Sequence, residues 1–369
     1  MKHRIGIDLR MLHHAGIGTY IREVVTSFVD SGIAKEIDLS LFGEPARHFE
    51  SSGLPRYPFY SRIYTVEEQF EYPFRLPHVR LWHAPHYNVP IFKGRTKLVV
   101  TIHDLVHWIF RHEFFNSLQA FYARQMFRQA LKSADHIITV SNQTCDDLLE
   151  YFDTDPERIT VIYEGVGDQF RELEPEKVAA VRAKYHLPES FFFYVGSIKP
   201  YKNVLLLIHL FRRLRQEGKI NSALVLVGKQ DRKYPHAFKE LSRLEGDPAI
   251  IHLDRVDHQD LIAMYNAALC LVHPSLYEGF GLTLLEAMAC GTPVIASRTS
   301  SIPEVVGDAA WLIDPWSQRE LSDAIVRIET CPGLREDLKR RGKIRAARYF
   351  WKETAVRTAE VYEKVLSKP

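Results

Sequence analysis

The sequence is poor in the features that define several large classes of protein. Its 369 residues include only four cysteines, which lie far apart and form no Cys-x-x-Cys pair. Such thiols are typical of a reducing compartment and do not support a disulfide framework or a thiolate zinc site. No stretch approaches the roughly 18 to 20 uncharged apolar residues of a transmembrane helix, and the first residues lack the apolar centre of a secretion signal. We therefore expect a cytoplasmic protein that at most contacts the inner face of a membrane.

The sequence also lacks an excess of either charge. It has 48 Lys and Arg against 46 Asp and Glu, a formal charge of +2. A protein that binds nucleic acid mainly through its phosphates needs a basic surplus, so we expect no nucleic-acid partner. The 46% hydrophobic and 25% charged residues are the proportions of an average soluble protein, which excludes a disordered, collagenous or coiled-coil chain. At this length two domains are expected.

Short, continuously apolar segments alternate with longer amphipathic ones along the chain. Segments such as residues 97–102 and 191–195 are bounded by Gly, Pro or Asp, as is typical of parallel strands that are buried on both faces. The alternation predicts an α/β protein with doubly wound parallel sheets.

The same pattern begins again near the middle of the chain. We predict two Rossmann-like domains, residues 1–168 and 169–349, with a charged linker containing a short helix at residues 168–190. A last helix at residues 350–369 is expected to cross back onto the first domain, after a break near residues 340–343.

The most informative segment is residues 274–286, Pro-Ser-Leu-Tyr-Glu-Gly-Phe-Gly-Leu-Thr-Leu-Leu-Glu. It follows an apolar strand and passes through two glycines into a helix, whose first N–H groups can hold an anion. Glu278 would lie in the loop and Glu286 inside the helix, so a sugar diphosphate would have a carboxylate on each side. A capped helix with two solvated glutamates explains the spacing equally well.

The spacing from Glu278 to Glu286 resembles the E-x7-E motif of the retaining glycosyltransferases of family 4. Residues 285–294 and 301–310 also look like that family, and the resemblance extends over essentially the whole chain. It implies the GT-B fold, in which two Rossmann-like domains face each other across a cleft that holds the active site. It also implies a nucleotide-sugar donor, no metal ion and no other cofactor.

The resemblance assigns roles to individual residues of this segment. Glu278 would contact hydroxyls of the donor sugar as a catalytic residue, and Glu286 would bind the ribose, since a carboxylate that only accepts hydrogen bonds suits a diol. Backbone amides would meet the sugar and the diphosphate at Phe280, Gly281, Leu282 and Thr283.

The turn from Gly196 to Lys202 is a second candidate site. A strand, a glycine turn and a lysine before a helix suit a phosphate, and the alternative for Lys202 is a solvated lysine at a helix cap. Family members often carry Gly-Arg at the turn and Lys six residues after the glycine. Lys202 matches as a catalytic and donor-binding residue, whereas Ser197 stands where Arg is common, so that Lys199 or Lys229 would have to supply a second charge. A small hydroxyl residue here also resembles bacterial polysaccharide and O-antigen mannosyltransferases.

Two features of the first half complete the predicted site. A loop contains Gly16 and Gly18 but lacks the third glycine of a dinucleotide fingerprint, which disfavours a nicotinamide cofactor. The resemblance implies that this loop closes over the donor. His103 follows a strand at the carboxyl edge where doubly wound sheets bind ligands, and the resemblance implies that it positions the donor sugar, while Asp104 would be structural or face the acceptor.

We predict no metal site. His103 and His107 have the spacing of a zinc pair, but the glutamate of His-Glu-x-x-His is absent. Residues 153–155 have the Asp-x-Asp pattern of a metal motif in the other major glycosyltransferase fold, but they precede Pro156, where Asp is typical of a turn.

Together these features predict a retaining, metal-independent glycosyltransferase acting on a saccharide or lipid-linked saccharide in polysaccharide biosynthesis. GDP-mannose is the donor expected first, and a UDP-hexose is the alternative. A sugar-nucleotide epimerase or hydrolase on the same fold, or a protein that binds nucleotide sugar without chemistry, stays open. Aromatic and basic residues between positions 56 and 80 would either contact a glycolipid at a membrane surface or pack in a helix hairpin.

Overall fold

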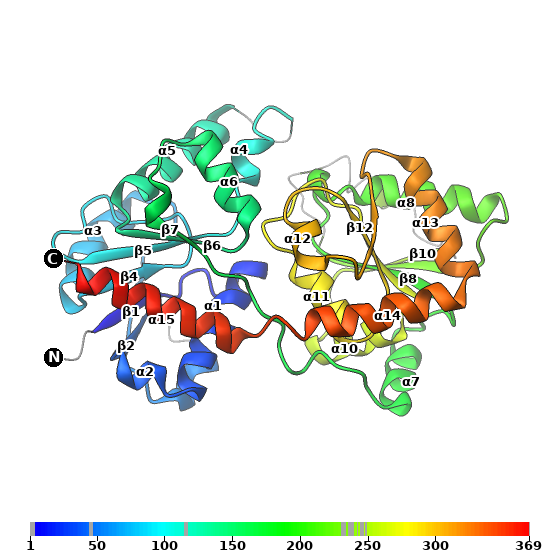
Figure 1. The fold of residues 1–369 in the computed structure, drawn as a ribbon, viewed down its shortest axis with the longest axis horizontal. Coiled ribbons are helices and arrows are strands. Elements are labelled where there is room, and N and C mark those ends of the chain that lie inside the picture. Colours follow the sequence, from blue (N-terminus) through cyan, green and yellow to red (C-terminus); the bar gives the residue numbers. More distant parts are fainter. Residues whose placement is uncertain are drawn as a thin grey trace. The chain divides into compact units, whose positions relative to one another are not determined.

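Two units, each built on its own parallel sheet, make up the chain (Figure 1). The computed structural model describes residues 4–43, 47–113, 117–229, 234, 240–241, 243, 247 and 249–368. The first unit is Met1–Gly165 together with Phe350–Pro369, and the second is Val166–Tyr349. The sequence predicts domain boundaries between residues 168 and 169 and between residues 349 and 350, whereas the structure divides the chain after Gly165 and after Tyr349.

The first unit has a seven-stranded sheet in the order β3-β2-β1-β4-β5-β6-β7, with every pairing parallel. Its central strands are buried on both faces, which is why they are continuously apolar in sequence. The strands are β1 (Ile5–Asp8), β2 (Leu39–Phe42), β3 (Arg56–Tyr57), β4 (Leu81–Ala84), β5 (Lys97–Ile102), β6 (His136–Thr139) and β7 (Ile159–Val161).

Helices cover both faces of this sheet, and the last helix of the chain is one of them (Figure 1). The helices are α1 (Ala15–Asp30), α2 (Ile33–Glu36), α3 (Val66–Arg75), α4 (Val106–Ile109), α5 (Ser117–Ser133), α6 (Asn142–Tyr151) and α15 (Trp351–Ser367). Among the described residues of this unit, the 3₁₀ helices are η1 (Arg47–Ser52), η2 (Leu76–His78) and η3 (Pro156–Arg158). No helix in the described part of the chain has the length and apolar character needed to cross a membrane.

A buried chain of hydrogen bonds ties α15 to the sheet. The hydroxyl of Tyr362 lies 2.6 Å from Nδ1 of His83, and Nε2 of His83 lies 2.8 Å from Oγ1 of Thr101. Thr101 in turn meets the hydroxyl of Tyr20 on α1 at 3.2 Å. Burial, with a smaller effect from His103, lowers the pKa of His83 to about 3, so its ring is neutral near pH 7. Polar side chains thus fix which face the terminal helix covers.

The second unit repeats the architecture with a six-stranded parallel sheet in the order β10-β9-β8-β11-β12-β13. The strands are β8 (Phe191–Val195), β9 (Ala223–Val227), β10 (Ile250–Leu253), β11 (Cys270–His273), β12 (Val294–Ser297) and β13 (Trp311–Ile313). The helices are α7 (Pro175–Lys184), η4 (Pro200–Lys202), α8 (Val204–Gln216), α10 (His258–Ala267), α11 (Leu282–Ala289), α12 (Ile302–Val306), α13 (Gln318–Thr330) and α14 (Pro332–Ala346).

Two expectations about this half of the chain were wrong. Residues 168–190 contain the predicted short helix, α7, but they are not a linker, because α7 buries Val181 and packs against α10 as part of the second unit. The predicted break at residues 340–343 lies inside α14, which continues to Ala346. Gly342 is at a close helix contact, where a Cβ would come within 3.2 Å of Met288, so the glycine serves packing rather than a turn.

Two expectations about the first half also need correction. Gly16 and Gly18 do not lie in a loop, since α1 begins at Ala15 and the N–H of Gly18 donates to the carbonyl of His14 at 2.8 Å. Gly18 is needed because the chain before the helix folds back on it: an added Cβ would lie 2.2 Å from the carbonyl oxygen of Leu12. Residues 56–80 form β3, α3 and η2 rather than a helix hairpin.

The two glycines of α1 offer a matched test of this packing. Gly18→Ala is expected to lower the free energy of unfolding by about 2 kcal/mol, because the new methyl group overlaps backbone that is difficult to move. Gly16→Ala is expected to be neutral or stabilising by about 0.5 kcal/mol, since no atom lies within 4 Å of its Cβ position. Urea denaturation of both variants checks this, and equal effects would contradict the close approach.

Candidate active site

The second unit places a ligand-binding edge where its strand order reverses. β9 lies on one side of β8 and β11 on the other, so the loops that follow β8 and β11 run apart at the carboxyl edge of the sheet. In doubly wound sheets this divergence makes the crevice that binds ligands. Lys202, at the end of η4, comes from the loop after β8, and Glu278 comes from the loop after β11.

The carboxylate of Glu278 is the centre of the site. The ammonium of Lys202 donates to both of its oxygens at 2.6 Å, and Nε2 of His273 lies 2.6 Å from Oε1. The Lys202 and Glu278 side chains are only 17% and 12% exposed. Burial alone would raise the pKa of Glu278, but Lys202 and His273 outweigh it and hold that pKa well below its usual range. Glu278 is therefore an anion that accepts hydrogen bonds at any physiological pH.

The backbone of Glu278 is held by two serines from the loop after β12. The N–H of Glu278 donates to Oγ of Ser300 at 3.0 Å, and that hydroxyl in turn contacts the Glu278 carbonyl. The hydroxyl of Ser301 donates to the carbonyls of Glu278 and Phe280 at 2.9 and 3.0 Å. The backbone of Glu278 and that of Phe280 are thus both fixed by hydrogen bonds just before α11 begins.

The turn after β8 packs closely beside the same carboxylate. Burial, and then the charge of Glu278, raise the pKa of Tyr194 above its usual range, and the Tyr194 hydroxyl donates to the carbonyl of Ser197 at 3.1 Å. A Cβ on Gly228 would lie 1.8 Å from the carbonyl oxygen of Gly196, so the loops after β8 and β9 meet through a glycine. Ser197 is therefore held at the predicted turn by its backbone.

The start of α11 presents the amides that the sequence pointed to. Gly281 precedes the helix with φ at +110°, a backbone conformation that glycine adopts without strain, and Leu282 and Thr283 form the first turn. Phe280 is buried, and its ring packs edge-on against Tyr349 at 5.9 Å. One turn into the helix, Glu286 accepts a hydrogen bond from the Tyr265 hydroxyl at 2.8 Å, which orients its carboxylate.

His103 belongs to the first unit, at the carboxyl end of β5. Its Nδ1 lies 3.2 Å from Oε1 of Glu164, and its Nε2 lies 3.1 Å from the carbonyl of Pro85. The ring of Tyr20 packs edge-on against it at 4.9 Å. The imidazole is thus held on both edges. Asp104, by contrast, accepts the N–H of Val106 at 3.0 Å and caps the turn that starts α4, which is the structural role allowed for it.

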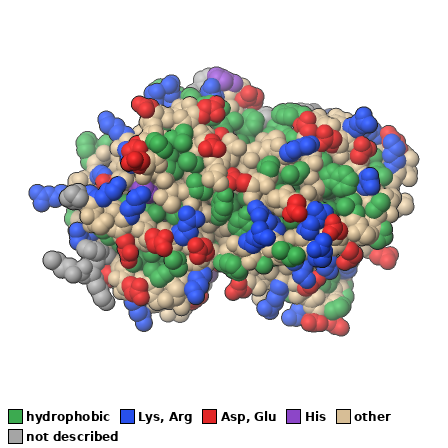
Figure 2. Space-filling model, viewed as in Figure 1, with side chains coloured by type: hydrophobic (Ala, Val, Ile, Leu, Met, Phe, Trp, Pro, Cys, Tyr) green, Lys and Arg blue, Asp and Glu red, His purple; other side chains and the backbone are tan. Residues whose placement is uncertain are grey.

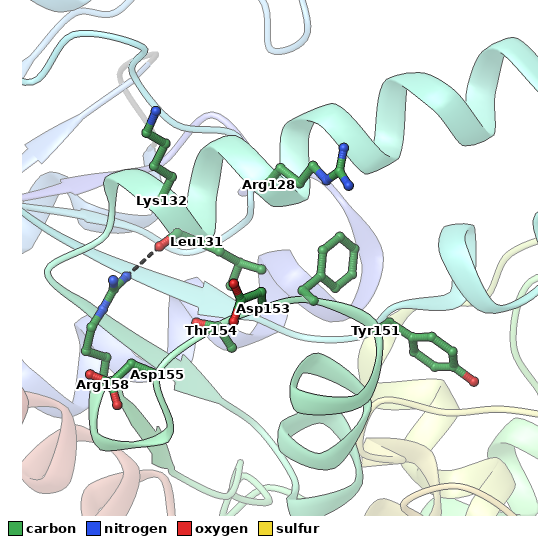
Figure 3. Close-up of a pocket in the computed structure, with 9 residues that line it drawn as sticks. Arg128, Leu131, Lys132, Tyr151, Asp153, Thr154, Asp155 and Arg158 are labelled. Atoms are coloured by element: carbon green, nitrogen blue, oxygen red, sulfur yellow. Dashed lines mark hydrogen bonds between the residues drawn. The ribbon is translucent and has the colours of Figure 1, made fainter.

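The Asp-x-Asp segment lies in a shallow pocket of about 370 Å³ on the first unit (Figure 3). Asp155 accepts the N–H of Glu157 at 2.9 Å and so caps η3, and Arg158 donates to the carbonyl of Ala134 at 2.8 Å. These contacts are those of a turn, as the sequence predicted. Within the described ranges no group of three or more His, Cys, Asp or Glu side chains has a metal-binding arrangement.

The structure therefore brings Lys202 and Glu278 into direct contact and places Ser197 and the start of α11 on the same unit. Sequence reasoning missed His273, Ser300, Ser301 and Glu164. Of these, His273 and Glu164 carried a usable signal. Each is a polar residue at or just after the end of an apolar strand, where the carboxyl edge of a parallel sheet collects side chains that face ligands.

The lowered pKa of Glu278 predicts a pH-dependent stability. A carboxylate whose folded-state pKa is depressed stabilises the protein fully above its unfolded value near 4.5, and the contribution is lost as the pH falls toward the folded value. Glu278→Gln should therefore cost about 2 kcal/mol at pH 6 and less at pH 4, measured by urea denaturation. Glu320→Gln, in the exposed pair with Arg298, serves as the control and should cost less at pH 6. A cost for Glu278→Gln that does not change between the two pH values would contradict the assignment.

Both units of the chain match families of known proteins. Residues 16–170 match the family described as Glycosyltransferase Family 4, and residues 180–345 match Glycosyl transferases group 1. The O-antigen chain mannosyltransferase B of Escherichia coli is 30% identical over 285 residues, which are 77% of this chain and 74% of that protein. The serotype-specific mannosyltransferase WbdA of Escherichia coli is 28% identical over 77% of this chain, but the chain spans only 36% of its length.

A solved structure shows the same fold at low identity. Anabaena Alr3699/HepE, in complex with UDP and glucose, aligns over 98% of this chain and 100% of its own with a TM-score of 0.79 and 19% identity. The two parallel-sheet units are those of the GT-B fold. The chain is a glycosyltransferase, and it belongs to the family 4 and group 1 glycosyltransferases.

Proposed function

We propose that the chain is a retaining, metal-independent mannosyltransferase that moves mannose from GDP-mannose to a saccharide or lipid-linked saccharide in polysaccharide biosynthesis. The observation that carries the proposal is the position of the Glu278 carboxylate. It is held as an anion between Lys202 and His273, at the edge of the sheet where the strand order reverses. Relatives named as O-antigen and serotype-specific mannosyltransferases support the sugar and the kind of product.

The residues divide the recognition of the donor among them. Glu278 accepts hydrogen bonds from hydroxyls of the sugar, since an ionised carboxylate has only acceptor sites to offer. Lys202 neutralises charge on the diphosphate, together with the first amides of α11, which carry the positive end of the helix dipole. Glu286, oriented by Tyr265, accepts from the ribose hydroxyls. His103 helps to place the sugar.

The chemical step proceeds on one face of the sugar. The acceptor oxygen forms its bond to the anomeric carbon on the side from which the diphosphate leaves, and the acceptor proton passes to the departing phosphate oxygen. Retention follows because both bonds lie on the same face. The protein contributes by stabilising the charge that develops on the leaving diphosphate with groups already in place, and Lys202 takes the part that a divalent cation would otherwise play.

A UDP-hexose is the second candidate donor. It is favoured by the fold neighbour Anabaena Alr3699/HepE, whose structure holds UDP and glucose. Purine and pyrimidine diphosphates share the diphosphate and the ribose, so Lys202, the start of α11 and Glu286 would serve either donor.

The donor is identified by thermal melting with GDP, UDP, ADP and dTDP, each in the presence of EDTA. A ligand that binds only the native state raises the melting temperature. We expect GDP alone to do so, and transfer from GDP-mannose to persist in EDTA. A rise with UDP alone would replace the donor but leave the mechanism in place. Activity that requires an added divalent cation would overturn metal independence, and donor turnover without any acceptor would favour a hydrolase or epimerase.

Lys202→Ala tests the charge at the diphosphate. The variant is expected to lose about 2 kcal/mol of affinity for GDP, or roughly 30-fold, because the lysine is largely removed from water where it meets the anion. Isothermal titration measures the loss. Lys219→Ala is the control, since Lys219 also pairs with a glutamate at 2.7 Å but is 57% exposed. Unchanged affinity in Lys202→Ala would refute the assignment.

A further inference from the structure

Charged and apolar side chains are interspersed on the face of the molecule drawn in Figure 2, as on an ordinary protein surface. An unusual backbone feature lies instead beside the candidate active site, in the loop after β12. Ser300 has a φ of +56°, in the left-handed region that residues other than glycine rarely adopt. Such conformations persist where the surrounding structure requires them, and they are frequent at functional sites.

The loop after β12 runs beside the loop that carries Glu278. β11 and β12 are parallel neighbours, and beyond their last paired residues side-chain hydroxyls continue the contact between the two chain segments. The hydroxyl of Thr299 donates to the carbonyl of Leu276 at 3.1 Å, and the hydroxyls of Ser300 and Ser301 reach the carbonyl of Glu278. The loop after β12 therefore supports the loop after β11 along its length.

The hydroxyl of Ser300 uses all of its hydrogen-bonding capacity on these two loops. It accepts the N–H of Glu278 at 3.0 Å and the N–H of Ser301 at 2.6 Å, and it donates to the carbonyl of Glu278. A hydroxyl has one donor and two acceptor sites, so all three are occupied. Because one oxygen binds both the N–H and the C=O of Glu278, it fixes the backbone there and, with it, the direction in which the carboxylate points.

The strain at Ser300 and its contacts with Glu278 belong together. A glycine at position 300 would adopt the same backbone conformation without strain, but it would lose all three hydrogen bonds. Ser300 therefore keeps a strained backbone together with a contact that glycine cannot make. This combination is expected of a residue that serves the site rather than the stability of the fold.

We propose that Ser300 is a positioning residue for sugar transfer. Its hydroxyl holds Glu278 in the orientation in which the carboxylate accepts hydrogen bonds from hydroxyls of the donor sugar. The inference rests on the proposed function and deepens it, since it assigns to Ser300 the recognition of the sugar and not that of the nucleotide.

The groups proposed to bind the nucleotide are supported separately. Lys202 lies in the loop after β8, and Glu286 is oriented by a hydroxyl from α10. The carbonyl of Phe280, just before the amides of α11, accepts a hydrogen bond from Ser301 at 3.0 Å. Loss of the Ser300 hydroxyl should therefore impair transfer of the sugar and spare the binding of the nucleoside diphosphate.

Ser300→Gly and Ser300→Ala test the proposal as a pair, because both remove the hydroxyl but only alanine keeps the strain. Ser300→Gly is expected to melt at a higher temperature than Ser300→Ala. Both should nevertheless lose roughly tenfold or more of kcat with the nucleotide sugar that the protein uses, since a small misplacement of a group at the reacting sugar has effects of that size. The Kd of the corresponding nucleoside diphosphate, measured by isothermal titration, should be unchanged.

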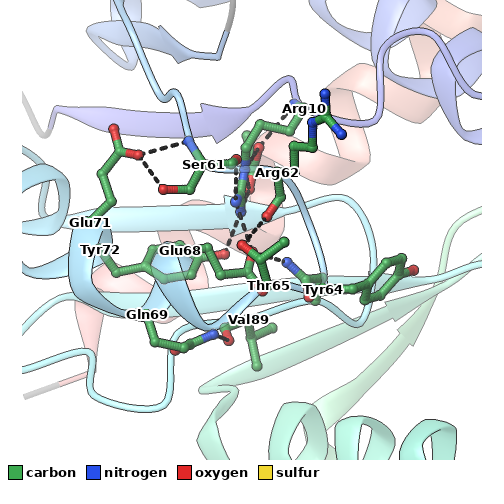
Figure 4. Close-up of polar contacts among 12 residues, drawn as sticks. Arg10, Ser61, Arg62, Tyr64, Thr65, Glu68, Gln69, Glu71, Tyr72 and Val89 are labelled. Carbon is green, nitrogen blue, oxygen red and sulfur yellow. Dashed lines mark hydrogen bonds and ion pairs between the residues drawn. The ribbon is translucent and has the colours of Figure 1, made fainter.

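Ser61→Ala is the matched control. The hydroxyl of Ser61 also donates to a glutamate, Glu71, at 2.7 Å, but this pair lies in the first unit (Figure 4). The variant should transfer sugar as the unmodified protein does.

Hydrogen exchange of the Glu278 amide, followed by NMR, adds a measurement that does not depend on activity. This amide should exchange at least roughly tenfold faster in both Ser300 variants than in the unmodified protein, because its hydrogen-bond acceptor is gone. An unchanged exchange rate would overturn the proposal. Faster exchange without any transfer by the unmodified protein would refute the proposed function and support the hold of Ser300 on Glu278.

Two results of the kinetic comparison would also overturn the proposal. One is activity that follows the melting temperature, with Ser300→Gly as active as the unmodified protein, since a purely structural role predicts that result. The other is a loss of affinity for the nucleoside diphosphate as large as the loss of kcat, since the hydroxyl would then support the whole site rather than the orientation of Glu278.

Discussion

The loops at the carboxyl edge of the second sheet are organised around one carboxylate, that of Glu278, which several hydrogen bonds hold in place. Glu278 lies in the loop after β11, and its strongest partner, Lys202, comes from the loop after β8. These are the two loops that diverge where the strand order reverses, so the ion pair joins the sides of the crevice that the topology opens. Removing Glu278 would leave the nearly buried ammonium of Lys202 without this carboxylate, and removing Lys202 would leave Glu278 with His273 as its remaining side-chain partner. His273, Ser300 and Ser301 add contacts to the same residue, and the start of α11 follows within four residues. The position of the helix amides is therefore tied to the position of the carboxylate.

The first unit uses a buried charge in a comparable way. Arg10 follows β1 and gathers Asp8, Glu68 and Tyr72 around one guanidinium. The cluster determines which side of α3 faces inward, and the apolar side of the helix is left outside as a consequence. Burying Val66, Phe70 and Phe74 would yield hydrophobic free energy, so the observed orientation costs stability unless something covers these side chains.

Much of the fold could be predicted from the sequence, because its strands are apolar on both faces. Residues 97–102 and 191–195 are strands as expected, and the strand–glycine–lysine and E-x7-E patterns pointed to Lys202 and Glu278. What failed depended on contacts between distant segments. Gly18 suggested a loop, yet it lies in a helix, and a glycine is needed there because the carbonyl of Leu12 leaves no room for a Cβ. Ser300 and Ser301 act on a residue more than twenty positions earlier, and no local pattern marks them. The orientation of α3, whose apolar side is exposed, could not be predicted from the sequence either, because it depends on the buried contacts of Arg10.

The Lys202–Glu278 pair also bears on how the proposed site could bind a diphosphate with Lys202 as its cation and Ser197 at the position where the family often has Arg. In the structure the ammonium serves both oxygens of the carboxylate. A diphosphate carries more negative charge than a carboxylate and competes for the same ammonium, so its binding would weaken the hold of Lys202 on Glu278. Glu278 would keep His273 as a partner and gain capacity to accept hydrogen bonds from sugar hydroxyls. The neutral amides of α11 would then carry part of the phosphate charge. On the proposed function, diphosphate binding and sugar recognition are therefore coupled through one lysine, and each becomes stronger when the other is in place.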